Sequence, residues 1–183
     1  MTSNYLKQAI MTNLSHQFNI PVIGFAAFSG TGKTTLLKQL IKELSQTKNI
    51  GLIKQSHHDI DIDVPGKDSF ELRKAGASQT LITSPYRSAL IKEYKDNHEP
   101  DLINIINQLD IKSLDIIFIE GFKHECFTKI ELHRQTLEKP YLYSNDENII
   151  AIATDDKKSS HTITTLDLNN TTEILNYICK QFF

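Results

Sequence analysis

Apolar and polar positions follow one another along this chain in a pattern that predicts strands and helices in turn. Continuous apolar runs at 20–26, 115–120 and 149–155 are typical of strands buried on both faces of a parallel sheet. Apolar residues spaced three and four apart predict amphipathic helices over 36–45 and 174–182. Strands that alternate with helices favour the α/β class, with a doubly wound, mainly parallel sheet flanked by helices.

Shorter elements fill the rest of the chain. Residues 79–83 and 88–94 are rich in strand-forming residues on either side of Ser84-Pro85-Tyr86-Arg87, which predicts a β-hairpin or two edge strands as an extension of the fold. An amphipathic helix is expected over 3–18. Further strands are expected at 50–54, 129–133 and 162–166.

The stretch after the second expected strand has an unusual pattern of acidic residues. Asp59, Asp61 and Asp63 alternate with apolar residues, which predicts a strand with its carboxylates on one face. Asp68, with Glu71 three residues further on, is interpreted as a capping box that opens the next helix. One of Asp59, Asp61 and Asp63 could hold Mg²⁺ or orient water, and a solvent-facing surface carboxylate is the alternative for each of them.

Composition and charge narrow the class of protein. The chain has 183 residues, 39% hydrophobic and 23% charged, which is typical of a globular protein. We expect residues 19–183 to form one domain, preceded by a helical extension at 1–18. The formal net charge of −2 offers no electrostatic case for binding nucleic acid.

The spacing of the cysteines and the length of the apolar runs indicate the cellular compartment in which we expect this protein. Cys126 and Cys179 lie far apart and form no CxxC motif, so a disulfide framework is not expected and a reducing cytoplasm fits. No apolar run approaches the length of a membrane span, and the first 18 residues have no targeting pattern. We therefore expect a cytoplasmic protein that does not engage the membrane.

The most informative motif lies between the first strand and the first long helix. The stretch 27–34 reads Ala-Phe-Ser-Gly-Thr-Gly-Lys-Thr, a Walker A pattern with Ala27 where the pattern has glycine. Glycines let backbone N–H groups converge on an anion, and the helix N-terminus adds partial positive charge. Lys33 would reach the phosphates and Thr34 would ligate Mg²⁺, whereas a plain strand-to-helix turn is the alternative for this loop alone. The expected nucleotide-binding residues are Ser29, Gly30, Thr31, Gly32, Lys33, Thr34 and Thr35.

Other candidate residues follow the ends of buried strands. Glu120 stands where a Walker B acid would bind Mg²⁺ together with Thr34. The catalytic residue, if there is one, is unknown; Asp63 and Glu120 are the candidates. Asp155 could accept hydrogen bonds from guanine, although no complete N-K-x-D motif precedes it. Candidate contacts to phosphate or substrate, with surface charge as the alternative, are His57, His58, Lys67, Asp68, Ser69, Arg73, Lys123 and His124.

A zinc site is the less favoured interpretation of the histidines. His57 and His58, with His124 and Cys126 elsewhere, match no standard zinc-ligand spacing.

With these stretches in view, the chain resembles the MobB family of molybdopterin-guanine dinucleotide biosynthesis adaptor proteins. The resemblance rests on residues 26–36, 54–63, 65–76 and 120–125, and it extends from about residue 20 to about residue 155. The first motif is common to P-loop proteins, whereas the combination with HHDxDxDxPGKDS and EGFKHE is far more specific. Alanine at the first position of the Walker A motif, Ala27 here, also resembles the pattern of that family.

The resemblance implies a P-loop NTPase fold, a homodimer and binding of GTP with Mg²⁺, with weak hydrolysis at most. It implies an adaptor that works with a MobA-type molybdenum cofactor guanylyltransferase, the enzyme that joins GMP to molybdopterin, and it leaves molybdopterin open as a further ligand. A P-loop small-molecule kinase or ligase is the alternative. A pure interaction module, whose nucleotide only maintains its shape, is a third interpretation.

Overall fold

The computed structural model describes residues 13–56, 60–95, 99–156 and 160–183. These residues form two compact units. The first unit contains the chain up to Gln55 together with Leu102–Phe183, and the second contains Ser56–Asp101. Each unit has its own sheet, with six strands in the first and two in the second.

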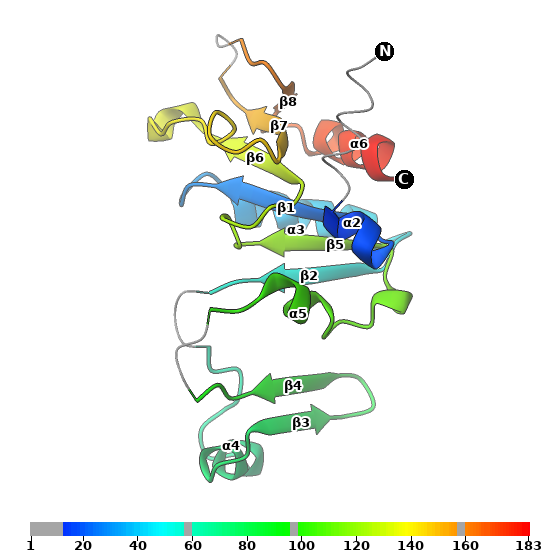
Figure 1. Cartoon of the computed structure of the whole chain (residues 1–183), viewed down its shortest axis with the longest axis vertical. Helices are drawn as coiled ribbons and strands as arrows, with labels where there is room; N and C mark the ends of the chain where they lie inside the picture. Colours follow the sequence, from blue (N-terminus) through cyan, green and yellow to red (C-terminus); the bar gives the residue numbers. More distant parts are fainter. Residues whose placement is uncertain (1–12, 57–59, 96–98, 157–159) are drawn as a thin grey trace. The chain divides into compact units, whose positions relative to one another are not determined.

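The sheet of the first unit has the strand order β2-β5-β1-β6-β7-β8, and all neighbouring strands run parallel (Figure 1). Because the strands are parallel, their carboxyl ends meet at one edge of the sheet, where α/β proteins bind ligands. The predicted doubly wound, mainly parallel sheet is therefore confirmed. The strands are β1 (Val22–Ala27), β2 (Ile50–Lys54), β5 (Ile116–Glu120), β6 (Lys129–His133), β7 (Ile149–Thr154) and β8 (Thr164–Asp167).

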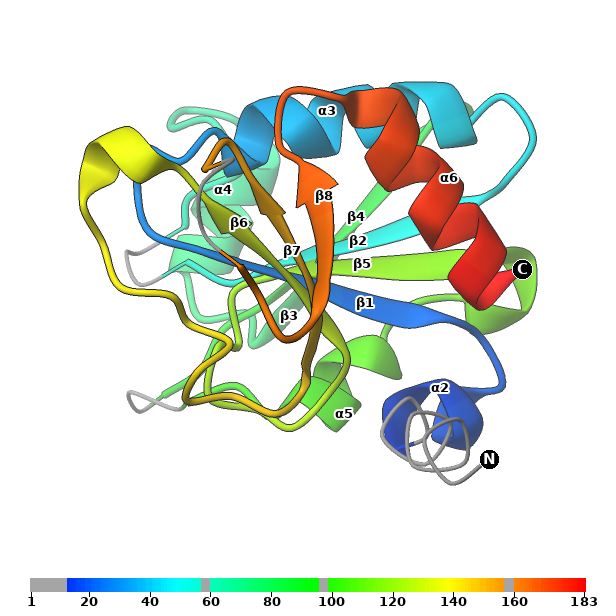
Figure 2. The same ribbon diagram turned by 90° about the horizontal axis from the view of Figure 1, so that it is seen from above.

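Helices cover both faces of this sheet. Figure 2 shows α3 (Lys33–Leu44) and α6 (Thr171–Phe182) on one face, with α2 (Asn13–Phe18) and α5 (Leu102–Ile106) on the other. Alternate residues of β5 serve the two faces, as the period of a strand requires. Phe118 packs in the core under α3 and α6, and Ile117 packs in the core with α2 and α5. Two short 3-10 turns, η1 (Ile111–Ser113) and η2 (Gln135–Leu137), complete the unit.

The end of the predicted N-terminal helix is observed as α2. Its residue Leu14 is buried with the β5 side chains, and the hydroxyl of Ser15 accepts a hydrogen bond from the N–H of Val22 at the start of β1. Residues 1–12 lie outside the described part of the chain, so the division into an extension at 1–18 and one domain at 19–183 stays a prediction. Among the described residues, no helix is long and apolar enough to cross a membrane.

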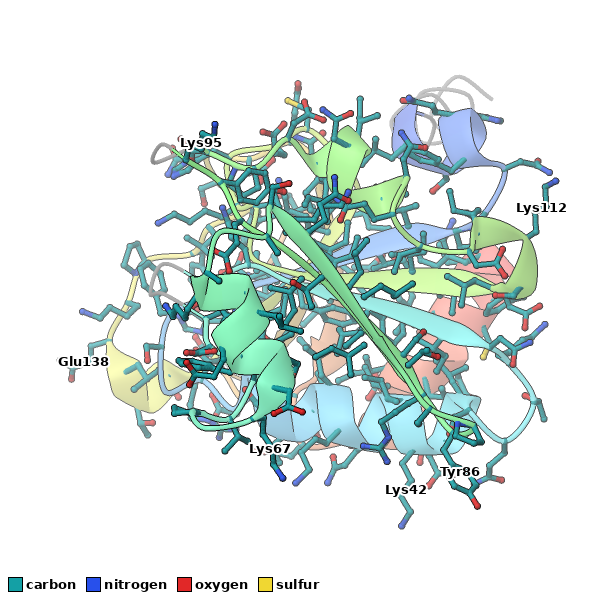
Figure 3. The ribbon with its side chains drawn as sticks, turned by 90° about the horizontal axis from the view of Figure 1, so that it is seen from below. Lys42, Lys67, Tyr86, Lys95, Lys112 and Glu138 are labelled. Atoms are coloured by element: carbon teal, nitrogen blue, oxygen red, sulfur yellow. The ribbon has the colours of Figure 1, made fainter. Side chains whose placement is uncertain are left out.

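The second unit consists of α4 (Asp68–Lys74) and an antiparallel hairpin of β3 (Gln79–Thr83) and β4 (Ser88–Lys92). The predicted hairpin is confirmed. Its turn is closed by a hydrogen bond from the Ser84 N–H to the Arg87 carbonyl. Tyr86 lies at this turn with its side chain pointing away from the ribbon (Figure 3), and it is 93% exposed.

The prediction of a strand over the alternating acids is wrong for the described residues of that segment. Residues 60–67 form turns and irregular structure, and the apolar side chains Ile60, Ile62 and Val64 are exposed. Asp61 and Asp63 instead accept hydrogen bonds from side chains of α4. Asp59 lies outside the described residues.

Candidate nucleotide-binding site

The loop that follows β1 has the backbone of a phosphate cradle. Gly30 and Gly32 have φ values of 84° and 100°, in the left-handed region that glycine adopts at low cost. Thr31, between them, is buried, and its hydroxyl donates to the Phe28 carbonyl at 2.7 Å. The loop therefore turns sharply between β1 and α3 and is fastened by its own threonine.

Helix α3 begins at Lys33, directly after the loop. Gly32 is its N-cap residue, and within the described part of the chain no side chain caps it by a hydrogen bond. The first N–H groups of the helix thus remain available to an anion, which the helix dipole also favours. A pocket of about 440 Å³ lies here, lined by Phe28, Ser29, Gly30, Thr31, Gly32, Lys33, Thr34, Thr35 and Glu120. The structure thus brings the predicted P-loop residues together with the predicted Walker B acid.

Glu120, at the end of β5, lies between two lysines. The Lys33 Nζ is 3.5 Å from one carboxylate oxygen and the Lys54 Nζ is 3.3 Å from the other. The parallel register explains the contact with Lys54, because Glu120 is paired with that residue of β2. Glu120 is also paired with Phe25 of β1, the strand that leads into the loop before Lys33. Lys54 was not expected as a site residue. Its position at the end of the second strand was the sequence feature that could have indicated it as a site residue.

A magnesium ion fits the oxygen donors of this pocket. Thr34 and Glu120 both line it, and Mg²⁺ usually takes one or two protein oxygens together with phosphate oxygens and water. Within the described residues, no group of three His, Cys, Asp or Glu side chains could hold a metal alone.

Hydrogen bonds with Gln55 hold the backbone at Glu120 and just after it. The Gln55 N–H donates to the Glu120 carbonyl at 2.8 Å, and its side-chain oxygen accepts from the Phe122 N–H at 2.7 Å. Gly121 has φ 106°, and a Cβ there would lie 2.5 Å from the Cβ of Gln55. Glycine after Glu120 is thus required by both backbone conformation and space.

Asp155 follows β7, and its carboxylate already has partners in the protein. One oxygen accepts from Arg134 at 3.0 Å and the other accepts from the Gln135 N–H at 2.8 Å. Arg134 also donates from Nε to the Thr31 carbonyl in the P-loop at 3.2 Å. Contact between Asp155 and guanine remains a prediction. Arg134 was missed, because no sequence pattern links it to a loop 103 positions away.

Lys123 and His124 line a different pocket from the P-loop. This second pocket, of about 590 Å³, lies between residues 123–126 and residues 143–148, with Lys129 also in its wall. Lys129 is buried, and its ammonium donates to the Glu125 carbonyl and to Asp146. The two lining sets share no residue, so the structure does not bring Lys123 and His124 to the phosphate cradle.

The remaining candidates belong to the second unit. Arg73 of α4 is buried and donates to Glu93 at 2.7 Å and to Asp61 at 2.8 Å. The hydrogen bond to Glu93 and the charge of Asp61 raise the pKa of the Arg73 guanidinium. Ser69 donates to Asp63 at 3.1 Å. Both terminal nitrogens of Arg73 are thus already engaged by carboxylates.

Two other predicted contacts flank the start of α4. Lys67 is the residue before the helix, and its side chain points away from the ribbon (Figure 3). Asp68 is the first helical residue, and within the described residues no side chain caps α4 by a hydrogen bond, so the predicted capping box does not form. Phosphate or substrate contacts by these residues stay predictions. His57 and His58 lie outside the described residues.

A parallel, doubly wound sheet with a glycine-rich loop between β1 and α3 and an acid at the end of β5 defines a P-loop protein. A family model described as "Molybdopterin guanine dinucleotide synthesis protein B" matches residues 22–155. This range covers more than half of the chain, which therefore belongs to the MobB family.

Curated relatives and solved structures agree with this family. The molybdopterin-guanine dinucleotide biosynthesis adapter protein of Escherichia coli (strain K12) is 45% identical over 163 residues, covering 88% of this chain and 93% of that protein. The protein of the same name from Haemophilus influenzae is 38% identical over 160 residues, covering 87% and 88%. A crystal structure of Bacillus subtilis MobB has the same fold, with a TM-score of 0.69 at 23% identity, covering 90% of this chain and 99% of that one.

Proposed function

We propose that this chain is a GTP-binding adaptor that assists the attachment of GMP to molybdopterin, forming molybdopterin guanine dinucleotide. The names of its curated relatives support the pathway. The observation that carries the nucleotide assignment is the P-loop pocket, where Lys33, the start of α3 and Glu120 surround about 440 Å³. A pocket of this kind offers an ammonium group and backbone N–H groups to phosphates.

The roles of the residues follow from their chemistry. Lys33 would exchange its contact with Glu120 for the β- and γ-phosphates, and the N–H groups of the loop and of the first turn of α3 would donate to the same phosphates. Thr34 and Glu120 would hold Mg²⁺ against them. Hydrolysis of GTP, if it occurs, would be slow, with Asp63 or Glu120 as the candidate to orient water.

The proposed partners are a second copy of this chain, a MobA-type guanylyltransferase and molybdopterin. The homodimer and the guanylyltransferase are supported by the membership of the chain in the MobB family. Sedimentation of the whole chain would test the homodimer. The rate at which the guanylyltransferase forms molybdopterin guanine dinucleotide, with and without this chain, would test the adaptor role.

Calorimetry with GTP, GDP and ATP in the presence of Mg²⁺ tests the nucleotide assignment. Wild-type protein should prefer GTP, and Lys33→Ala should bind it about a hundredfold more weakly, because a charged hydrogen-bond donor is lost. Lys42→Ala is the matched control, since Lys42 lies on the same helix with its side chain pointing away from the protein (Figure 3). A preference for ATP with turnover that depends on an acceptor would instead favour a small-molecule kinase. Absence of any nucleotide binding would overturn the proposal.

A further inference from the structure

Residues that follow three neighbouring strands lie close together beside the phosphate cradle. Thr31 lies in the loop after β1, Arg134 directly follows β6, and Asp155 directly follows β7. These strands are adjacent and parallel, so their carboxyl ends share one edge. Arg134 joins the three segments, donating from Nε to the Thr31 carbonyl and from Nη1 to Asp155.

The contact with Thr31 determines which way one peptide group of the loop faces. In a trans peptide the carbonyl and the next N–H point in opposite directions. Arg134, which holds the Thr31 carbonyl, is not among the residues that line the P-loop pocket, whereas Gly32 is. The N–H of Gly32 points to the side opposite the carbonyl that Arg134 holds, and within the described residues it donates to no backbone carbonyl.

We propose that Arg134 is a positioning residue for the phosphate cradle: it holds the Thr31–Gly32 peptide so that the Gly32 N–H donates to a bound phosphate. This inference rests on the proposed nucleotide-binding function. Arg134 acts from outside the pocket and does not itself contact the nucleotide. Its planar guanidinium suits the task, because one rigid group can donate to two acceptors at once.

Asp155 takes part in the same arrangement. Its carboxylate is held by the Gln135 N–H and in turn orients Arg134, whose side chain is about one-third exposed. Removing Asp155 should therefore disturb the cradle through Arg134. This role differs from recognition of guanine, which would affect the base and leave phosphate binding unchanged.

Three ligands separate these roles. GTP carries guanine, ITP lacks the 2-amino group of guanine, and inorganic tripolyphosphate has no base or sugar. We would titrate each by calorimetry, with Mg²⁺, into wild-type protein, Arg134→Lys, Asp155→Ala and the double variant. Arg87→Lys is the matched control, since Arg87 is an exposed arginine at the hairpin turn. Thermal unfolding of each variant would verify that it folds.

Arg134→Lys should weaken all three ligands by a similar factor of about ten, because lysine cannot hold both acceptors in the same geometry. Asp155→Ala should weaken them in parallel, and the double variant should lose no more than Arg134→Lys alone, since both act through one contact. Arg87→Lys should bind as wild type does.

Other outcomes would overturn the inference in distinguishable ways. Wild-type affinity of Arg134→Lys for tripolyphosphate would show that Arg134 does not position the cradle. A loss in Asp155→Ala confined to GTP would assign Asp155 to the base. Wild-type protein that binds tripolyphosphate without preferring GTP would contradict the proposed function alone, whereas binding of none of the three would remove both.

Discussion

The Lys33 ammonium lies 3.5 Å from the Glu120 carboxylate, so the lysine expected to bind phosphate is paired with the acid expected to bind Mg²⁺. Lys54 contacts the second oxygen of the same carboxylate. A Mg²⁺–nucleotide complex would replace these contacts with phosphate at Lys33 and metal at Glu120. The ion pair thus keeps both groups beside the pocket and would be exchanged if this proposed ligand entered.

Glu120→Gln should reduce the effect of Mg²⁺ on nucleotide affinity. The variant loses a charged metal ligand, while Lys33 becomes freer to bind phosphate. We expect the gain in GTP affinity on adding Mg²⁺ to fall about tenfold relative to wild type, with affinity in EDTA unchanged or higher. Calorimetry with and without Mg²⁺ measures both values.

Glu43→Gln is the control for this change, since Glu43 is an exposed acid on α3. If Glu120→Gln kept the full wild-type response to Mg²⁺, Glu120 would not be a metal ligand.

The fold was predictable because its signals are local. The apolar runs of β1, β5 and β7 are typical of strands buried on both faces, and the P-loop motif predicted its own neighbours on either side. The contact of Arg134 with Thr31 was not predictable, because it depends on which strands are adjacent in the sheet and leaves no periodic pattern.

The acidic stretch shows the opposite case, in which a local pattern was misleading. The alternation in 60–64 has the period of a strand, yet Arg73 draws Asp61 into an ion pair and Ser69 binds Asp63. These hydrogen bonds determine the path of the segment, and its apolar side chains remain exposed. Side-chain hydrogen bonds of this kind compete with regular backbone pairing.

Asp146→Asn should destabilise the first unit. Lys129 is buried, and its ammonium donates to Asp146 at 2.9 Å and to the Glu125 carbonyl at 2.6 Å. Without the carboxylate, the buried charge keeps only neutral partners, at a cost of about 3 kcal/mol, near the lower end for buried pairs because Asp146 is partly exposed. Urea unfolding at neutral pH measures the difference. Glu147→Gln, at the exposed neighbouring acid, should leave stability within about 0.5 kcal/mol of wild type.

The Lys129–Asp146 pair also predicts how the folding stability changes at acidic pH. Burial would raise the pKa of Asp146, but hydrogen bonds from Lys129 and Asn148 outweigh it and lower the pKa below the ordinary 3.8. A lowered carboxyl pKa contributes stability that is present above its ordinary value and is lost as the pH falls toward the folded value. Wild-type protein should therefore lose stability below about pH 4, and Asp146→Asn should lose less there. Parallel acid losses in the two proteins would contradict this assignment.

Glu131 should have the opposite pH dependence. Its buried carboxylate accepts from the N–H groups of Leu142 and Tyr143, both at 2.8 Å. Burial raises the pKa of Glu131 above the ordinary 4.5, and these two hydrogen bonds oppose the shift without cancelling it. Because the pKa of Glu131 is raised in the folded protein, the contribution of this carboxyl to folding stability is full below pH 4.5. It is lost as the pH rises through the pKa of the folded state.

Glu131→Gln should remove this dependence, because glutamine does not titrate. Urea unfolding from pH 4 to 7 measures this dependence. An unchanged decline with rising pH in the variant would assign the titration to another group.

Arg73→Lys should loosen the second unit and leave the first unit unchanged. The guanidinium of Arg73 joins α4 to Glu93, which follows β4, and to Asp61 in the irregular segment. Lysine cannot donate to both carboxylates from one planar group. Because both carboxylates are nearly half exposed, we expect a modest effect, roughly fivefold faster amide exchange in α4, β3 and β4. Hydrogen exchange resolved by peptide measures this, with Arg87→Lys as the control. Equal acceleration in β1 and β5 would show that the two units unfold together, whereas unchanged exchange in α4 would show that Arg73 does not stabilise its unit.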